Sequence, residues 1–213
     1  IKEYYKGSKV FLLTSKPYSF FMSECPYIDG VLTDKRLPRW NLIYLFNLKK
    51  LLSRYIFSHV FDLQNSSRTK FYQKFILNKS IWSSSETTLG PGQKKSDFDN
   101  SPVLDRMELQ LKKKNIPTKY VKKIDLTWAL EDLSKLNDQH TDGNYILIFP
   151  FCSSKHQNKK WPYFKELINV IRQEYNNRYN LLISPGPREI EEANELNART
   201  ILNNGEPINI KML

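Results

Sequence analysis

The 213-residue sequence has only two cysteines, no long apolar run and no glycine-rich phosphate motif, and each absence excludes a class of protein. Cys25 and Cys152 lie far apart and in no metal-ligand spacing, so we expect a reduced, cytosolic protein rather than a disulfide framework. No run of about 18 apolar residues and no signal peptide is visible, so we expect no membrane-spanning segment. Neither GxxxxGK nor GxGxxG occurs, which excludes a P-loop and a simple dinucleotide fingerprint.

Histidine is also scarce. His59, His140 and His156 share no spacing with cysteines or acidic residues, so we expect no metal site. No Ser-His-Asp or Cys-His arrangement can be argued from these positions either. Of the three, only His156 lies in the segment predicted to form an anion-binding loop.

What the chain does contain is apolar and basic material. Apolar residues make up 40% of the sequence, with 12 Phe, 12 Tyr and 4 Trp, which is ample for a core. Lys and Arg outnumber Asp and Glu by 33 to 22, giving a net charge of +11. This excess fits either a solvated lysine-rich surface or an anionic partner, which could be a nucleotide, a nucleic acid or an anionic membrane face.

Strand and helix patterns alternate along the chain, which predicts βαβ units and mainly parallel sheets. We expect residues 83–101 to form a long functional or mobile loop. The expected strands are 9–14, 28–33, 59–63, 79–82, 145–149, 179–183 and 208–210, and the expected helices are 41–57, 67–77, 102–115, 161–175 and 188–198.

The same patterns predict two domains. We expect an N-terminal domain at 1–115, a connection at 116–142 and a C-terminal domain at 143–213. Both ends of the sequence interrupt the repeating α/β pattern, so we expect both domains to be incomplete, the first lacking its first strand.

The segment from Tyr145 to Tyr163 predicts a strand, a polar loop and a helix. In doubly wound α/β proteins, ligands bind at the carboxyl ends of the strands, and lysines beside a helix N-terminus favour phosphate. Ser153, Ser154 and Lys159 supply hydroxyl donors and a positive charge for a diphosphate. A solvated basic loop explains the same residue types.

Two further groups follow predicted strands. Gly186 makes a tight turn between two prolines, and Glu189 either adds favourable charge at a helix start or accepts hydroxyls of a sugar or ribose. Asp62, Gln64 and Arg68 either hold a polar acceptor in a cleft or serve as strand-end and capping groups. Aromatic and lysine residues alternate between Tyr72 and Trp82, but this pattern also fits a core, and we expect no nucleic acid as partner.

The order of three motifs resembles glycosyltransferase family nine, the ADP-heptose:lipopolysaccharide heptosyltransferases. Members carry a first-domain strand ending in Asp-Leu-Gln, as at Asp62 to Gln64. Their second domain opens with a strand and a Lys-basic-Trp-Pro helix start, as at Lys159 to Pro162. Their next strand ends in a Gly- and Pro-containing turn with a glutamate, as at Gly186 to Glu189.

The resemblance implies a GT-B architecture of two Rossmann-like domains, with an acceptor side in the first and the nucleotide-sugar in the second. Carried over by position, Ser153, Ser154 and Lys159 would hold the donor diphosphate, while Glu189 and Gly186 would contact its nucleoside or sugar. The implied reaction transfers a heptose or related sugar from an ADP-sugar to a lipid-linked acceptor with inversion. No metal is expected, and the enzyme would be cytoplasmic, working peripherally at the inner membrane.

The sequence departs from this family at its two ends. The family's catalytic Asp would precede Ile1 and its Asp-Thr-Gly-x-x-His segment would follow Leu213, so the catalytic residue is unknown. We therefore expect the 213-residue chain itself to be inactive. The alternative function is a non-catalytic α/β protein that binds nucleotides or RNA.

Overall fold

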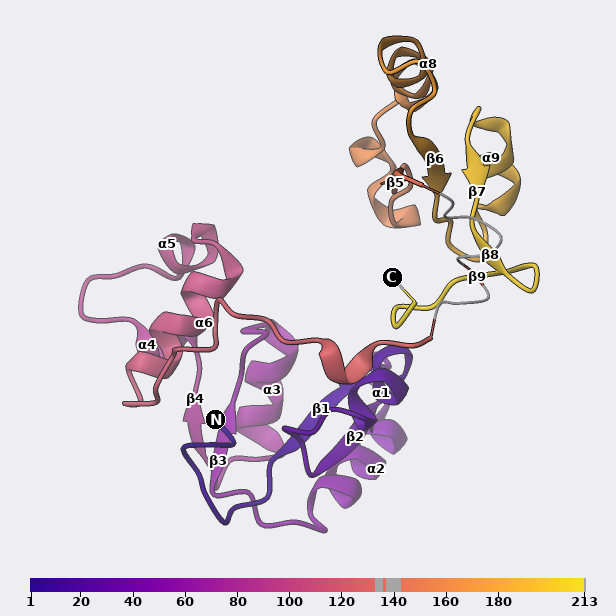
Figure 1. Cartoon of the computed structure of the whole chain (residues 1–213). Coiled ribbons are helices and arrows are strands. Elements are labelled where there is room, and N and C mark those ends of the chain that lie inside the picture. Colours follow the sequence, from indigo (N-terminus) through magenta and orange to yellow (C-terminus); the bar gives the residue numbers. More distant parts are fainter. Residues whose placement is uncertain (133–135, 137–142, 213) are drawn as a thin grey trace. The chain divides into compact units, whose positions relative to one another are not determined.

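The computed structural model describes residues 1–132, 136 and 143–212 and divides the chain into two compact units, Ile1–Trp128 and Ala129–Leu213 (Figure 1). The division falls within the connection expected at 116–142. The domain limits at 115 and 143 stay a prediction, and His140 lies outside the described residues. No described helix is long and apolar enough to cross a membrane.

The first unit contains two small parallel sheets. β1 (Phe11–Ser15) pairs with β2 (Gly30–Asp34), and β3 (His59–Phe61) pairs with β4 (Ile81–Ser83). All four lie where apolar, β-branched runs predicted strands, so those predictions are confirmed. Gly30 lies opposite Phe11, and a Cβ at Gly30 would come within 2.8 Å of the Phe11 ring, so a larger residue at position 30 would displace that ring.

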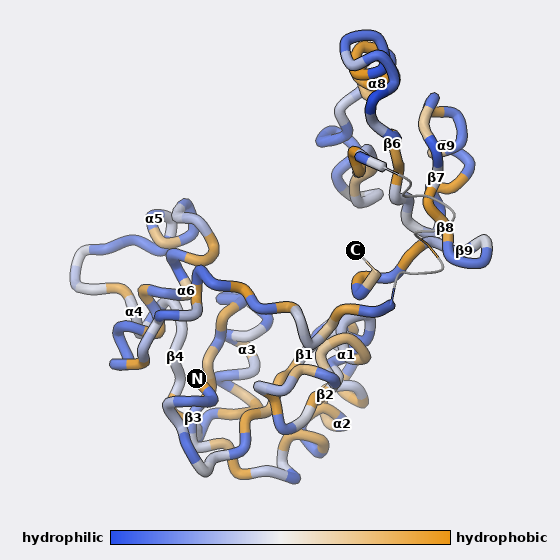
Figure 2. Tube along the Cα trace, in the orientation of Figure 1, coloured by the Kyte–Doolittle hydropathy of each residue, from blue (hydrophilic) through white to orange (hydrophobic). Residues whose placement is uncertain are grey.

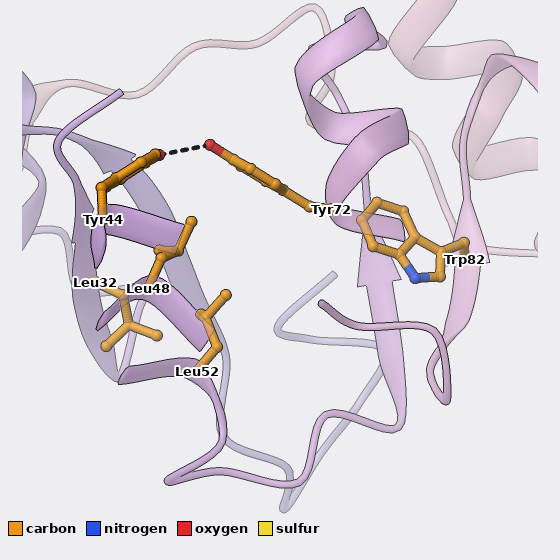
Figure 3. Packing of buried hydrophobic residues seen from close by; sticks show 6 residues of the cluster. All are labelled: Leu32, Tyr44, Leu48, Leu52, Tyr72 and Trp82. Carbon is orange, nitrogen blue, oxygen red and sulfur yellow. Dashed lines mark hydrogen bonds between the residues drawn. The ribbon is translucent and has the colours of Figure 1, made fainter. Parts of the chain in front are cut away.

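Helices follow the strands. α1 spans Lys16–Ser23, α2 spans Leu42–Leu52 and α3 spans Ser67–Phe75. Asn41 caps α2 by accepting the backbone N–H of Tyr44 at 2.9 Å, and Ser66 caps α3. One core joins α2 and α3 to β2 and β4 (Figure 3); its buried members are Leu32, Tyr44, Leu48, Leu52, Tyr72 and Trp82.

The segment 83–101 corrects one prediction, because it is not a long irregular loop. It contains α4 (Ser85–Thr88) and α5 (Lys95–Asn100), and α6 follows at Val103–Lys112. The Ser84 backbone N–H donates to Thr87 Oγ1 at 2.9 Å, which starts α4, and Phe98 of α5 is only 4% exposed. One buried aromatic among polar residues is too weak a pattern to reveal a helix. A short 3₁₀ helix, η1, spans Thr127–Ala129.

The second unit holds a three-stranded parallel sheet in the order β5 (Tyr145–Ile148), β6 (Asn180–Ile183), β7 (Arg199–Thr200). α8 (Phe164–Glu174) follows β5, and α9 (Ile190–Glu195) follows β6. These elements confirm the predicted strand, helix, strand, helix order. One buried cluster consists of Ile148, Ile168, Leu181, Ile183 and Ala193, and a second consists of Leu136, Leu182 and Ile201.

The end of the chain also differs from the prediction. β8 (Leu202–Asn203) and β9 (Glu206–Pro207) form an antiparallel hairpin, and the strand expected at 208–210 is wrong. Asn204 and Gly205 both have positive φ (52° and 83°), as a type I′ hairpin turn requires. Beyond the hairpin, Asn209 Oδ1 accepts the backbone N–H of Lys211 at 2.7 Å, which folds the segment into a turn.

Candidate functional site

A cavity of about 420 Å³ lies in the second unit, beside the loops that leave the carboxyl ends of β5 and β6. Ligands of parallel α/β sheets bind at this edge. The two loops predicted from sequence to bind the donor therefore meet around one space. Its lining residues are Phe151, Cys152, Ser153, Ser154, Gln157, Lys160, Gly186, Pro187, Arg188, Glu189 and Glu192.

The first loop brings a different lysine to the cavity than the one singled out by sequence. Lys160 lines the cavity, whereas Lys159 is exposed and is not one of the lining residues. Between Ser154 and Lys159 the chain forms the short 3₁₀ segment η2, with a non-helical kink at His156. A kink of this kind changes the direction in which successive side chains point.

Lys160 is held from two sides. Its ammonium pairs with the Glu192 carboxylate and lies 5.5 Å from the centroid of the Phe151 ring. The lysine side chain is 29% exposed, so the pair is partly shielded from water. A half-buried ammonium at the rim of a cavity is suited to an anionic group.

The second loop closes on its own glutamate. Glu189 Oε2 accepts the backbone N–H of Gly186 at 2.7 Å, and the Glu189 N–H donates to the Gly186 carbonyl at 3.0 Å. The Glu189 carboxylate therefore fixes the turn that forms one wall of the cavity. Its predicted contact with sugar or ribose hydroxyls stays a prediction.

The charges around the cavity are mixed. Lys160 and Arg188 are positive, and Glu189 and Glu192 are negative. Both carboxylates already have partners, one in a backbone N–H and one in an ammonium. An arriving anion therefore has to compete with Glu192 for Lys160. Hydroxyls from Ser153 and Ser154 add donors on the same cavity.

In the first unit, Asp62 and Gln64 lie at the carboxyl end of β3. Asp62 is 7% exposed, and its Oδ1 accepts the backbone N–H groups of Gln64 at 3.1 Å and Asn65 at 2.9 Å. Gln110, fully buried on α6, donates to the Asp62 carbonyl at 3.0 Å and to the Ser83 carbonyl at 2.8 Å. These contacts tie the ends of β3 and β4 together.

Arg68 contributes to another cluster. It donates to the Leu37 carbonyl at 2.9 Å and to the Tyr72 hydroxyl at 3.2 Å. The hydrogen bond with Tyr72 raises the pKa of Arg68. The structure thus brings Asp62 and Gln64 into one turn, while Arg68 is engaged with α3 and the loop before α2.

The centre of that second cluster is Asp34, which the sequence analysis missed. Asp34 is 5% exposed and accepts hydrogen bonds from both tyrosine hydroxyls, Tyr44 to Oδ1 and Tyr72 to Oδ2, the latter at 2.7 Å. The two hydroxyls are 2.9 Å apart (Figure 3). Burial and the nearby carboxylate raise the pKa of Tyr44, and burial raises that of Tyr72. The only signal in the sequence was an Asp at a predicted strand end.

Within the described residues, no group of three or more His, Cys, Asp and Glu side chains could hold a metal ion. Metal independence stays a prediction. The cavity offers hydroxyls, basic groups and a fixed turn, which are chemical means of binding an anion and a polar group beside it.

Comparisons with known proteins identify the fold of the chain. No family model matches the chain, and no curated protein matches it by sequence. Among solved structures, the chain is similar to one with a heptosyltransferase fold, which agrees with mixed α/β units built on small parallel sheets. The particular structure is E. coli heptosyltransferase WaaC with ADP, at a TM-score of 0.60 and 14% identity, covering 99% of this chain and 69% of that one. At this identity the likeness shows the fold alone.

Proposed function

We propose that this chain is part of a GT-B glycosyltransferase that moves a heptose or related sugar from an ADP-sugar to a lipid-linked acceptor, with inversion. The fold likeness extends over 99% of the chain to an enzyme solved with ADP. The observation that carries the proposal is the cavity, because it joins the two loops that the family resemblance assigns to the donor.

In this proposal the donor occupies the second unit. The hydroxyls of Ser153 and Ser154 donate to the diphosphate, and a lysine supplies the positive charge. We assign that charge to Lys160 rather than Lys159, because Lys160 lines the cavity. An ammonium beside the leaving diphosphate stabilises the charge that develops as the sugar departs, so the reaction needs no metal. Glu189 and Gly186 lie beside the nucleoside or sugar.

The acceptor belongs to the first unit in this proposal. Asp62 and Arg68 hold the backbone around them in place through their hydrogen bonds, so we give them a supporting role on the acceptor side. Gln64 is exposed beside Asp62 at the end of β3 and is the residue of the three that we expect to touch the acceptor. The enzyme would work at the cytoplasmic face of the membrane, where a lipid-linked saccharide lies.

The test is calorimetric titration of the 213-residue chain with ADP. We expect Lys160→Ala to weaken ADP binding about tenfold or more, because a charge-assisted hydrogen bond contributes roughly 1.5–3 kcal/mol. Lys159→Ala is the matched control, since it removes an adjacent lysine and should change affinity less than about twofold. Thermal unfolding of both variants checks that the fold is intact.

Two outcomes would overturn the proposal. The first is the absence of ADP binding by the intact chain. The second is binding of single-stranded RNA oligonucleotides with a steep dependence on salt, at least as tight as ADP, which would favour the nucleic-acid alternative. Equal losses of ADP affinity in the two lysine variants would instead show that the positive charge of the whole loop, and not Lys160 in particular, binds the diphosphate.

A further inference from the structure

The outward surface of α2 has exposed apolar side chains. The sequence that contains α2 has several basic residues and no acidic residue among them. Between Asp34 and Asp62 the sequence contains no acidic residue. Its six basic residues are all exposed, and none forms an ion pair with a described residue. They are Lys35, Arg36, Arg39, Lys49, Lys50 and Arg54.

Large apolar side chains lie on the same helix and just before it. Trp40 is 84% exposed, Leu42 75%, Ile43 77% and Phe46 68%. In an ordinary protein the outward face of a helix is polar. Here both faces of the first two turns are apolar, and Figure 2 shows hydrophobic residues along α2. We call Trp40, Leu42, Ile43, Phe46, Lys49 and Lys50 the α2 surface.

Helical geometry places these groups together. At about 100° per residue, Leu42, Phe46, Lys49 and Lys50 fall within one arc of the helix, opposite the buried side chains. The buried side is occupied by Tyr44, Leu48 and Leu52, which pack into the core of the first unit. The outward side thus has apolar groups in its first turns and lysines in its last turn.

An anionic lipid surface suits this combination best. Aromatic and aliphatic side chains enter the boundary between headgroups and acyl chains, while neighbouring lysines and arginines contact anionic headgroups. A second copy of the chain would bring two sets of basic residues against each other, which is unfavourable. Nucleic acid would gain little from Leu42 and Ile43, because neither stacks on bases or donates a hydrogen bond.

We propose that the α2 surface docks the protein on an anionic phospholipid bilayer. This inference rests on the proposed function, because a lipid-linked acceptor is presented at such a surface. The inference goes beyond the proposed function by naming the part of the molecule that contacts the bilayer. Docking through exposed side chains of one helix gives peripheral, reversible binding.

The experiment is co-sedimentation of the 213-residue chain with vesicles of phosphatidylcholine, with and without 30–40% phosphatidylglycerol (about the anionic content that tests charge attraction). We expect binding to the anionic vesicles and little to the neutral ones. Ile43→Ser with Phe46→Ser should weaken binding about tenfold or more, since each loses apolar area for insertion. Trp40→Ser, outside the helix, gives the same test without a change in α2 itself.

The charge is tested separately. Lys49→Gln with Lys50→Gln should weaken binding to anionic vesicles about thirtyfold, because each basic residue near such a surface contributes about 1 kcal/mol. The matched control is Lys113→Gln with Lys114→Gln, an adjacent pair directly after α6. The helix before this pair contains the acidic residues Asp105 and Glu108. Removing the two lysines should therefore change vesicle binding less than about twofold.

Several outcomes would overturn the inference. They are no binding to anionic vesicles, equal losses in the two lysine pairs, or a dimer in solution that Ile43→Ser with Phe46→Ser converts to monomer. ADP titration of the same samples separates the two proposals. ADP binding without vesicle binding would overturn only the docking role of the α2 surface. Vesicle binding without ADP binding would overturn only the proposed donor site.

Discussion

In the unit Ile1–Trp128, the carboxylates at the ends of β2 and β3 accept hydrogen bonds from within the unit, whereas in Ala129–Leu213 the polar side chains at the strand ends line a cavity of about 420 Å³. Asp34 after β2 accepts two tyrosine hydroxyls, and Asp62 after β3 accepts two backbone N–H groups. In the second unit, Ser153, Ser154 and Lys160 lie after β5 and line one cavity together with the loop after β6. The strand-end carboxylates thus serve cohesion in the first unit, where a smaller cavity of about 250 Å³ also lies beside the end of β2 and is lined by Thr33 and Tyr44. In the second unit the strand-end loops form the candidate site.

The sheets differ in a related way. β6 has a partner on each side, and Leu181, Leu182 and Ile183 are 4%, 0% and 0% exposed. β1 pairs with β2 alone, and all five of its residues are only partly buried. A strand with two neighbours can anchor its unit by apolar burial, so its loops need not be used for that purpose. Each described strand of the first unit has one neighbour, so hydrogen bonds between its helices and strand ends contribute more to the stability of this unit.

The largest expected effect tests the sheets. Leu182→Ala removes a fully buried side chain from the middle strand and should lower the free energy of unfolding by about 2–5 kcal/mol. Leu12→Ala, on the partly buried β1, should cost about 1 kcal/mol or less. Hydrogen exchange followed by mass spectrometry reports each unit separately. Similar losses in the two variants would contradict the contrast between β6 and β1.

Local patterns predicted β1 to β6 because each of these is a short, mainly apolar run, whereas β7, which has only two residues, was not predicted. The helices at 85–88 and 95–100 were missed, since their only apolar anchor is Phe98 and their start depends on a Ser84–Thr87 contact. The hairpin at 202–207 was missed because Asn204 and Gly205 connect two strands of only two residues each.

The candidate site was predictable to the level of the loop. Both loops were expected at the strand ends, and the structure places them on one cavity. The choice between Lys159 and Lys160 was not predictable, because it depends on a kink at His156 and on Glu192, which is 32 residues away. The Asp34 cluster was hidden for the same reason, since its partners lie 10 and 38 residues further along the chain.

The second prediction tests whether the first unit uses its strand-end carboxylate for cohesion. Asp34→Asn removes one acceptor position facing two buried hydroxyls and should cost about 1–3 kcal/mol of unfolding free energy. Asp99→Asn is the control, because Asp99 pairs with lysine and arginine at the surface and should cost less than about 0.5 kcal/mol. ADP affinity should not change in either variant. A fall in ADP affinity for Asp34→Asn would break the comparison between the units.

The third prediction concerns alkaline pH. Burial and Asp34 raise the pKa of Tyr44 above its usual 10.0, so the folded chain retains a proton that the unfolded chain releases. Stability from this group is complete below about pH 10 and is lost as the pH rises from there towards the folded pKa. In urea titrations between pH 8 and 11, the loss above pH 10 should reach roughly 1 kcal/mol per pH unit. Tyr44→Phe should reduce that slope, and an unchanged slope would show that the Tyr44 hydroxyl does not contribute to it.

The smallest effect compares two matched glycine turns, one in each unit. Gly186 donates its N–H to Glu189 Oε2 at 2.7 Å, and Gly90 donates its N–H to Gln93 Oε1 at 2.8 Å, three residues along in both cases. A Cβ at Gly186 would lie 2.9 Å from Glu189 Oε2, whereas one at Gly90 would meet its nearest atom at an ordinary 3.6 Å. Gly186→Ala should therefore displace the Glu189 carboxylate.

The carboxylate is the flexible end of a side chain, so the loss is limited to one hydrogen bond of about 0.5–1.5 kcal/mol. We expect ADP affinity to fall about two- to tenfold in Gly186→Ala, because the turn forms a wall of the cavity. Gly90→Ala should leave both stability and ADP affinity within about 0.5 kcal/mol of the parent chain. If Gly186→Ala binds ADP as well as Gly90→Ala does, the glutamate turn is only a loop closure. The polar groups at this strand end would then serve cohesion, as they do in the first unit.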